Sequence, residues 1–288
     1  MKKTTALVAA LAVSLFSVNA FAQKSESQNE SFFFNHWSVG VGLLEDFHIQ
    51  AATTILPNLQ LRVLYSTLHP YVGVADTFLK KNPNIGTIKP FHYSFPIGYK
   101  GNGMQIDNID LDAQLLSREI NLFLDFFPSE ISSIRFTGGV IIDLTPRIIN
   151  ATGTPNPALS QADRDKEFFG ISADPQGLVH MYATYGLKTI RPYLGIGFGR
   201  PVDVQKRVSV NFDLGVAYIN GLHIYSESYF DDPNNPKPVE LNEKWFNDYP
   251  DAKEALGSSA DKIIEYIGMA NSFPVLPYAR LTLNVRLF

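Results

Sequence analysis

Apolar and polar residues alternate along much of the chain, and a period of two residues predicts β-strands that have one apolar and one polar face. The clearest case is 208–219, in which Val208, Val210 and Phe212 fall on one face and Ser209 falls on the other. The segments with this pattern, in chain order, are 37–43, 47–55, 59–66, 120–126, 134–142, 179–187, 190–199, 208–219, 222–226 and 278–288. The pattern therefore predicts an all-β protein with about ten strands.

The connections between these segments differ in length in an ordered way. The third, fifth and ninth are long, near 69–110, 144–177 and 227–274, whereas the even-numbered ones, such as 188–192 and 220–221, are short. Antiparallel barrels of bacterial outer membranes combine an even number of strands with short turns at one end and longer loops at the other. We therefore predict a transmembrane antiparallel β-barrel of about ten strands, with eight or twelve as alternatives, and long loops in those three ranges.

The first residues have the features of a secretory signal peptide. A basic start, Lys2 and Lys3, precedes an apolar stretch and a small-x-small cleavage motif that ends at Ala22. No later segment reaches the roughly 18 consecutive apolar residues of a membrane helix. We expect 1–22 to be removed after export and 23–288 to form one barrel domain in the cell outer membrane.

In a membrane barrel the apolar strand faces contact lipid and the mixed faces point into the lumen. The inward faces then carry charges of both signs, together with glycines that leave room for long neighbouring side chains. The charged residues predicted to face the lumen are Arg62, Glu119, Asp125, Arg135, Arg191, Asp213, Arg280 and Arg286. Because buried charges need partners, we expect arginine–carboxylate pairs that largely fill the lumen, and a narrow polar conduit is the alternative.

Aromatic residues near the strand ends are candidates for the girdles that border a membrane-spanning barrel. They are Trp37, Tyr65, Phe126, Phe127, Tyr185, Phe198, Tyr218 and Tyr278. Within the last long loop, 241–270 loses the two-residue period and predicts a short helical insertion before the last strand. The sequence leaves open whether this insertion caps a loop, plugs the barrel or lies in the periplasm.

Composition narrows the range of functions. The chain has 288 residues, a formal net charge of −4 and no cysteine, which excludes disulfides and thiolate metal sites and disfavours nucleic acid as a partner. Its six histidines form no HExxH motif and no GxSxG motif occurs. We therefore expect no metal, no cofactor and no enzymatic activity, with an outer-membrane hydrolase as the minor alternative.

Two pairs of short blocks resemble a known family. The first pair is a strand that ends in aspartate-aromatic-aromatic-proline at 124–128, followed by an arginine-containing strand with paired glycines at 134–139. The second is Pro-Tyr-Leu-Gly at 192–195, followed by Asp-Leu-Gly-Val at 213–216. These blocks resemble small outer-membrane β-barrel proteins of Gram-negative bacteria, a family that is mostly uncharacterised in function. The resemblance implies the barrel fold and the outer-membrane location.

The resemblance also implies partners, namely outer-membrane lipid, lipopolysaccharide and the barrel-assembly machinery. Chains of this class usually end in an aromatic insertion signal, which Phe288 supplies, although the residues at alternate positions before it are polar. The leading expectation is a structural or surface-interaction role with a filled lumen. The alternatives are a narrow porin-like channel for small solutes and a soluble periplasmic β protein.

Overall fold

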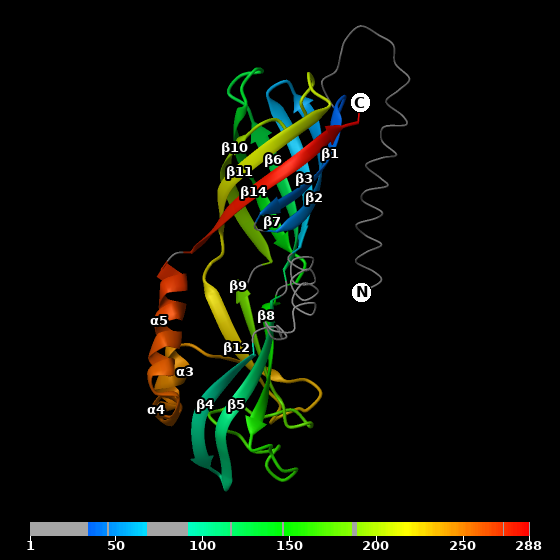
Figure 1. Cartoon of the computed structure of the whole chain (residues 1–288). Coiled ribbons are helices and arrows are strands. Elements are labelled where there is room, and N and C mark those ends of the chain that lie inside the picture. The colour runs from blue at the N-terminus through cyan, green and yellow to red at the C-terminus, as the bar shows by residue number, and fades with distance from the viewer. Residues whose placement is uncertain are drawn as a thin grey trace, which may run out of the picture. The chain divides into compact units, whose positions relative to one another are not determined.

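The chain folds into two antiparallel sheets, one of which is a closed barrel (Figure 1). The computed structural model describes residues 34–44, 46–67, 92–115, 117–145, 147–185, 189–272 and 274–287. The predicted signal peptide, 1–22, and Phe288 lie outside the described residues. The barrel strands are β1 (Trp37–Leu44), β2 (Phe47–Leu56), β3 (Leu59–Thr67), β6 (Arg118–Phe126), β7 (Ile134–Asp143), β10 (Ile190–Phe198), β11 (Val208–Tyr218) and β14 (Val275–Arg286).

A second, six-stranded sheet and three helices complete the described structure. The strands of this sheet are β4 (His92–Gly101), β5 (Met104–Leu115), β8 (Arg147–Asn156), β9 (Val179–Tyr185), β12 (Leu222–Ser228) and β13 (Lys237–Glu240). The helices are α3 (Glu243–Asp248), α4 (Pro250–Leu256) and α5 (Ser258–Ser272).

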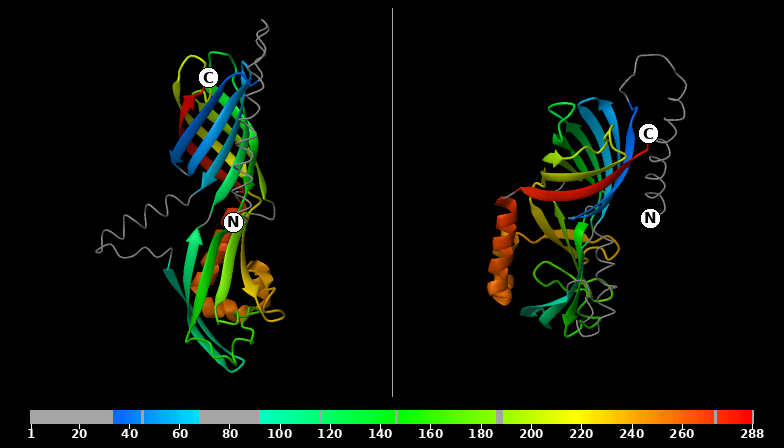
Figure 2. Two further views of the ribbon diagram at one scale, coloured as in Figure 1. Left: turned by 90° about the vertical axis from the view of Figure 1, so that its right-hand side faces the viewer. Right: turned by 45° about the horizontal axis from the view of Figure 1, so that its top comes forward.

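The barrel closes because its first and last strands pair, as Figure 2 shows. Around the barrel the strand order is β1, β14, β11, β10, β7, β6, β3 and β2. Ser38 of β1 lies opposite Arg286 of β14. Closure leaves no strand edge with unpaired backbone groups. The predicted antiparallel β-barrel is confirmed.

The barrel has eight strands, not about ten. Every predicted segment is a strand, but the segments at 179–187 and 222–226 correspond to β9 and β12, which belong to the second sheet. The connections predicted at 188–192 and 220–221 are accordingly not barrel turns, since each joins a strand of one sheet to a strand of the other. Alternation does not distinguish the two kinds of strand, because the second sheet also has one apolar and one polar face.

The two ends of the barrel differ. At one end, which we call the short-turn end, the strands are joined by turns at 57–58, 127–133 and 199–207, and β1 begins and β14 ends there. At the other end, the connections from β3 to β6, from β7 to β10 and from β11 to β14 contain the second sheet and the helices. We call the second sheet and its helices the extension, and this end of the barrel the extension end.

The extension has a hydrophobic core of its own on one face of its sheet. The buried core residues are Met104, Ile106, Ile109, Leu159, Phe168, Ile171, Ala173, Val179, Leu241, Trp245, Phe246, Ala252 and Ala260. Complete burial of one such aliphatic side chain contributes about 1.5–3 kcal/mol. The ranges predicted as long loops, 69–110, 144–177 and 227–274, supply β4, β5, β8, β13 and the helices, so their described parts are largely folded structure rather than loops.

The predicted helical insertion before the last strand is present as α3, α4 and α5. Asn242 caps α3 by accepting the backbone N–H of Trp245 at 3.0 Å, and Pro250 begins α4, where its fixed φ fits the helix. Helix α4 contacts β4 and α5 contacts β12, so the insertion packs on the extension rather than plugging the barrel. Among the described residues, no helix is long and apolar enough to span a membrane.

Candidate functional site

The inward side chains of the barrel strands form the candidate site of this chain. The structure places all the predicted lumen-facing charges except Arg286 inside the barrel, with 0–5 % of their surface exposed. These residues are Arg62, Glu119, Asp125, Arg135, Arg191, Asp213 and Arg280. Arg286 lies at the short-turn end instead, where it donates to the backbone oxygens of Asp203, at 3.2 Å, and Val204.

Two arginines and two aspartates form a first ion cluster toward the short-turn end. Arg62 of β3 pairs with Asp125 of β6 (Nε–Oδ2 2.6 Å) and with Asp213 of β11 (Nη1–Oδ2 2.9 Å). Arg135 of β7 lies 2.6 Å from Asp213 and 3.4 Å from Asp125, and Thr137 donates its hydroxyl to Asp125 at 2.6 Å. Every charge therefore contacts opposite charges, which a buried ionic group requires.

A second ion cluster lies toward the extension end. Arg191 of β10 is 2.6 Å from Glu119 of β6 and 2.7 Å from Asp143 of β7. Arg280 of β14 is 3.0 Å from Asp46, in the turn between β1 and β2, and 3.7 Å from Glu119. Three carboxylates thus face two guanidinium groups.

His48 belongs to the second ion cluster. Its Nδ1 is 2.7 Å from an oxygen of Asp46, and its Nε2 is 2.9 Å from the hydroxyl of Thr282. The order of carboxylate, imidazole and hydroxyl is that of a hydrolase relay. Both His48 and Thr282 are 0 % exposed, however, so a substrate does not reach this hydroxyl in the folded barrel.

An aromatic layer lies between the two ion clusters. The ring centroid of Phe123 is 5.4 Å from the guanidinium carbon of Arg62, in the first cluster, and 5.9 Å from that of Arg280, in the second. The ring of Tyr193 stacks on Phe123 at 4.4 Å and meets the ring of Tyr278 edge-on at 6.0 Å. The interior is therefore filled across its width by two charged layers and an aromatic layer.

Inward glycines make room for the largest of these side chains. A Cβ atom at Gly197 would overlap the guanidinium of Arg135, and a Cβ atom at Gly215 would overlap the phenol of Tyr193. An eight-stranded barrel has an interior just wide enough for side chains to fill. Glycine at these positions thus leaves the space that a long inward side chain nearby occupies.

The turn at 199–207 covers the short-turn end of the barrel. Val202 is completely buried, and both of its backbone groups bond to the side chain of Gln60, at 3.1 Å for N–H to Oε1 and 2.8 Å for Nε2 to the carbonyl. Ser38 donates its hydroxyl to the carbonyl of Pro201 at 2.7 Å. These bonds fasten the turn to β1 and β3.

The structure separates the predicted girdle residues into different environments. Phe126, Phe198 and Tyr218 are on the outward faces of barrel strands and nearly half exposed. Tyr65 is half-buried on β3. Tyr185 does not fit a girdle, because β9 belongs to the extension.

Three further predicted girdle residues are buried, which contradicts the prediction: Trp37, Phe127 and Tyr278. Tyr278 shares the inward face of β14, and its hydroxyl accepts a hydrogen bond from Arg191 at 2.6 Å. Trp37 begins β1 and is stacked against Phe34 at 6.1 Å. Phe127 follows the end of β6, where alternation no longer fixes the direction of a side chain.

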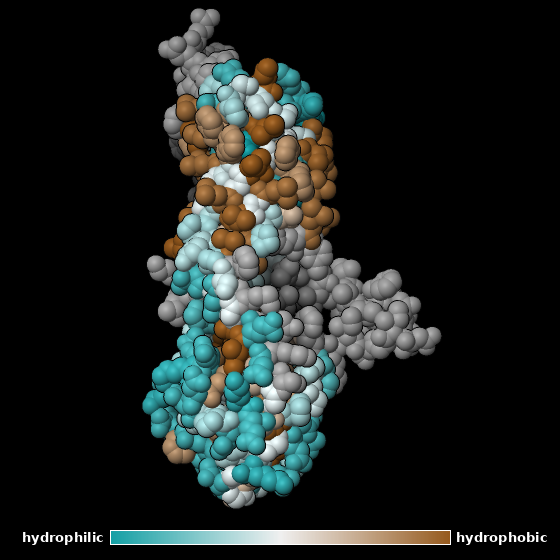
Figure 3. Space-filling model, turned by 90° about the vertical axis from the view of Figure 1, so that its left-hand side faces the viewer, coloured by the Kyte–Doolittle hydropathy of each residue, from teal (hydrophilic) through white to brown (hydrophobic). Residues whose placement is uncertain are grey.

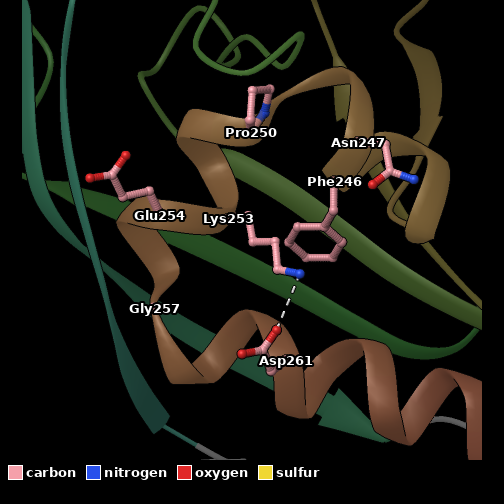
Figure 4. Close-up of a pocket in the computed structure, with 7 residues that line it drawn as sticks. All are labelled: Phe246, Asn247, Pro250, Lys253, Glu254, Gly257 and Asp261. Atoms are coloured by element: carbon pink, nitrogen blue, oxygen red, sulfur yellow. Dashed lines mark ion pairs between the residues drawn. The ribbon is translucent and has the colours of Figure 1, made fainter.

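The extension contains a surface pocket of about 440 Å³ that is lined by residues of α3, α4 and α5 (Figure 4). Phe246 supplies its apolar wall, and Lys253 pairs with Asp261 across it at 3.4 Å. Asn247 and Glu254 also line the pocket. The part of the chain that the structure describes holds no cluster of histidine and acidic residues arranged to bind a metal.

No protein-family model and no curated protein sequence matches this chain. Its structure is similar to that of CarO from Acinetobacter baumannii, with a TM-score of 0.41 and 14 % identity over 89 % of this chain and 99 % of CarO. CarO2 from the same organism gives 0.40 and 14 %, over 87 % and 97 %. A major outer membrane protein from Thermus thermophilus gives 0.33 and 15 %, over 88 % and 98 %. At this distance, function has to be derived from the chain's own residues.

Several residues of the ion clusters were not among the predicted site residues: Asp46, His48, Asp143 and Thr282. His48 is in phase with Gln50 on the inward face of β2, so alternation was a sufficient signal for it. Asp46 and Asp143 stand in a turn and at the end of a strand, where the two-residue period gives no direction.

Proposed function

We propose that this protein is an outer-membrane β-barrel with a closed interior, which anchors the extension at the cell surface for a structural or interaction role. One observation carries the proposal: relative to a water-soluble protein, the barrel is inside out. Its charged side chains are buried in the interior, and its large apolar side chains are exposed on the outside. Soluble proteins almost never bury Arg, Asp and Glu in such numbers, and they rarely expose contiguous apolar patches larger than a few hundred Å².

The exposed apolar residues form a band on the outward faces of the barrel strands. They include Val39, Val41, Leu43, Ile49, Leu122, Leu124, Ile134, Phe136, Ile190, Leu194, Ile196, Val208, Val210, Leu214, Val216, Leu281, Leu283 and Val285. Figure 3 shows hydrophobic residues over the barrel and mainly hydrophilic residues over the extension. The barrel strands have 8 to 12 residues, which matches the roughly 9–11 residues of a tilted strand that crosses a bilayer.

The burial of the interior charges supports a closed lumen rather than an open channel. A water-filled path past the ion clusters would leave their charged groups accessible to water, whereas Arg62, Arg135, Arg191 and Arg280 are among the largest fully buried side chains. The turn at 199–207 also covers one end of the barrel through its bonds to Gln60. Such a barrel holds a domain at a membrane rather than passing a solute.

The asymmetry of the barrel supports an orientation. Outer-membrane barrels have short turns in the periplasm and longer segments outside the cell, so the extension lies at the cell surface in this proposal. Lipid and lipopolysaccharide are then the partners of the apolar band. The barrel-assembly machinery is the partner that inserts the exported chain.

Fractionation and gel migration test the membrane anchor. We expect the chain in the outer-membrane fraction, and we expect unheated protein to migrate differently from heated protein because the folded barrel resists detergent. Recovery of the chain as a soluble periplasmic protein would overturn the anchor.

Single-channel recording tests the closed lumen separately. Purified protein that shows heat-modifiable migration is added to planar lipid bilayers, and we expect no steady conductance. Reproducible conductance steps would support a narrow channel for small solutes and overturn the closed interior, but they would leave the membrane location intact.

A further inference from the structure

Basic residues gather at the short-turn end of the barrel. Arg200, Lys206 and Arg207 belong to the turn at 199–207, and Arg286 ends β14 beside this turn. The backbone N–H of Arg286 donates to the carbonyl of Arg207 at 2.8 Å, and its guanidinium donates to two other carbonyls of the turn. Four cations are thus held on one turn and on the strand end beside it.

The charge of these residues is not neutralised within the described part of the chain. Arg200 and Arg286 donate to backbone carbonyls, which carry no net charge. Carboxylates at this end come from Glu130 and Asp203, and Asp203 accepts two backbone N–H groups of its own turn, at 2.9 and 3.2 Å. The interior arginines each pair with a carboxylate, whereas no ion pair joins the four cations of this end to a described carboxylate. Positive charge is therefore in excess at the short-turn end.

Lys206 and Arg207 are the two cations of this group whose side chains do not hold the turn in place. Both are exposed, and their side chains form no hydrogen bond or ion pair with a described residue. The two residues bond within the fold through backbone atoms, Lys206 through its N–H and Arg207 through its carbonyl. Their charged groups are therefore available to an anion outside the protein.

These two residues lie at the border of the apolar band. Strand β11 begins at Val208, directly after Arg207, and Val208 is 53 % exposed on the outward face. The strand has 11 residues, so at about 3.3 Å per residue and a tilt of about 40° it crosses roughly 28 Å of membrane. This length is close to the hydrocarbon thickness of about 30 Å. The layer of lipid phosphates therefore begins at the level of Lys206 and Arg207.

We propose that Lys206 and Arg207 bind the phosphate of an anionic phospholipid in the leaflet at the short-turn end. The ammonium and guanidinium groups donate charge-assisted hydrogen bonds to phosphate oxygens. Each cation close to an anionic lipid surface strengthens binding roughly fivefold. This binding rests on the proposed function, in which the short-turn end faces the periplasm and the leaflet around it consists of phospholipid.

The helices of the extension carry the opposite charge. Their carboxylates outnumber their lysines, with Glu243, Asp248, Asp251, Glu254, Asp261 and Glu265 against Lys244, Lys253 and Lys262. Carboxylates repel anionic headgroups, so we expect the preference for anionic lipid at the short-turn end. The place of Lys206 and Arg207 beside the first lipid-facing residue of β11 also favours a phospholipid over a soluble acidic protein.

A natural fluorescent reporter lies close to this surface. The chain has two tryptophans, and Trp245 is in the core of the extension. The carbonyl of Trp37 accepts the N–H of Leu287 at 2.8 Å, next to the bond between Arg286 and Arg207 on the other side of β14. Trp37 is thus two strand spacings, roughly 10 Å, from Arg207. Quenching of Trp37 by lipid therefore reports on the lipid at the short-turn end, over a constant signal from Trp245.

Reconstitution into vesicles tests the lipid preference. The exported protein, verified by heat-modifiable migration, is placed in phosphatidylcholine vesicles with increasing fractions of brominated phosphatidylglycerol or of brominated phosphatidylcholine, since bromine quenches tryptophan on close approach. We expect quenching at a severalfold lower fraction of the anionic lipid, and a loss of this difference in about 1 M sodium chloride, which screens charges. Equal quenching by the two lipids, or a preference that high salt does not change, overturns the inference.

Variants locate the preference. Lys206→Gln combined with Arg207→Gln is expected to reduce the ratio of the two lipid affinities at least fivefold. The matched control, Lys100→Gln combined with Lys244→Gln, removes the same charge from exposed positions of the extension and should leave the ratio unchanged. An unchanged ratio in the first variant, or an equal loss in the control, overturns the inference.

The failure of this lipid site and the failure of the membrane anchor give different results. A heat-modifiable barrel that inserts into vesicles and shows no lipid preference leaves the proposed function standing. A chain that is recovered as a soluble periplasmic protein overturns the proposed function and the lipid site together.

Discussion

Replacing Arg62 with methionine removes one of the two positive charges of the first ion cluster while keeping much of the side chain's length. Arg62 pairs with Asp125 at 2.6 Å and with Asp213 at 2.9 Å, and it is completely buried. In the variant, Arg135 alone would face both aspartates, leaving one uncompensated negative charge in the interior. Breaking a buried pair in this way costs about 3–5 kcal/mol, so we expect the free energy of unfolding to fall by about that amount.

A second variant separates charge from packing. Arg62→Met combined with Asp125→Asn restores a neutral cluster, in which Arg135 and Asp213 remain paired at 2.6 Å. Replacing a buried ion pair with neutral groups of similar volume is often close to neutral in stability. We therefore expect the double variant to recover most of the stability that the single variant loses.

Urea unfolding in detergent micelles measures both effects, with fluorescence and the mobility of unheated samples on gels as two readouts of the transition. The control is Lys244→Met, which breaks an exposed ion pair with Asp248 (2.5 Å) on α3. No measurable change is expected there, because exposed pairs contribute little. A single variant as stable as the wild type, or a double variant less stable than the single one, would refute the ion-pair interior.

Three further predictions test the glycines, the lipid-facing band and the extension. Gly197→Ala is expected to reduce the fraction of protein that shows heat-modifiable migration, because its Cβ would displace Arg135. In an Arg135→Ala background the same substitution should have little effect. An equal loss in both backgrounds would argue against this overlap. Leu194 lies on the outward face of β10 and is 70 % exposed, so Leu194→Arg should lower the free energy of unfolding in lipid vesicles by about 2–4 kcal/mol. Ile131 lies in a turn and is 89 % exposed, so Ile131→Arg should be tolerated. Equal tolerance of both variants would contradict a lipid-facing band. Burial and a hydrogen bond to a carboxylate raise the pKa of Tyr229 from 10.0 to about 12, so the folded extension holds this proton more tightly than the unfolded chain does. Its contribution to stability is present below pH 10 and is lost as the pH rises to 12. The stability of Tyr229→Phe, followed by circular dichroism, should therefore decline less steeply with rising alkaline pH than that of the wild type. An equal decline in the two proteins would contradict this role of Tyr229.

Alternation predicted the strands and, on most of them, the face on which a side chain lies. Arg62, Asp125 and Asp213 each fall on the polar side of an alternating segment, and the structure places all three in the interior. A period of two does not encode which strands pair, because pairing depends on contacts between distant segments. The contact of Arg62 with Asp213, 151 residues along the chain, was therefore beyond the reach of the sequence pattern.

The same limit explains the error in strand number, and glycine positions correct it only in part. Strands β9 and β12 also alternate, but their polar faces carry His, Tyr, Thr and Glu and no glycine. Inward glycines occur on β1, β7, β10 and β11, because a closed interior has to hold long side chains such as Arg135 and Tyr193 beside them. An open face has no such steric need, since its side chains extend into solvent. Glycine on a polar face therefore favours a barrel strand, but its absence decides nothing, because β2, β3, β6 and β14 line the same interior without a glycine.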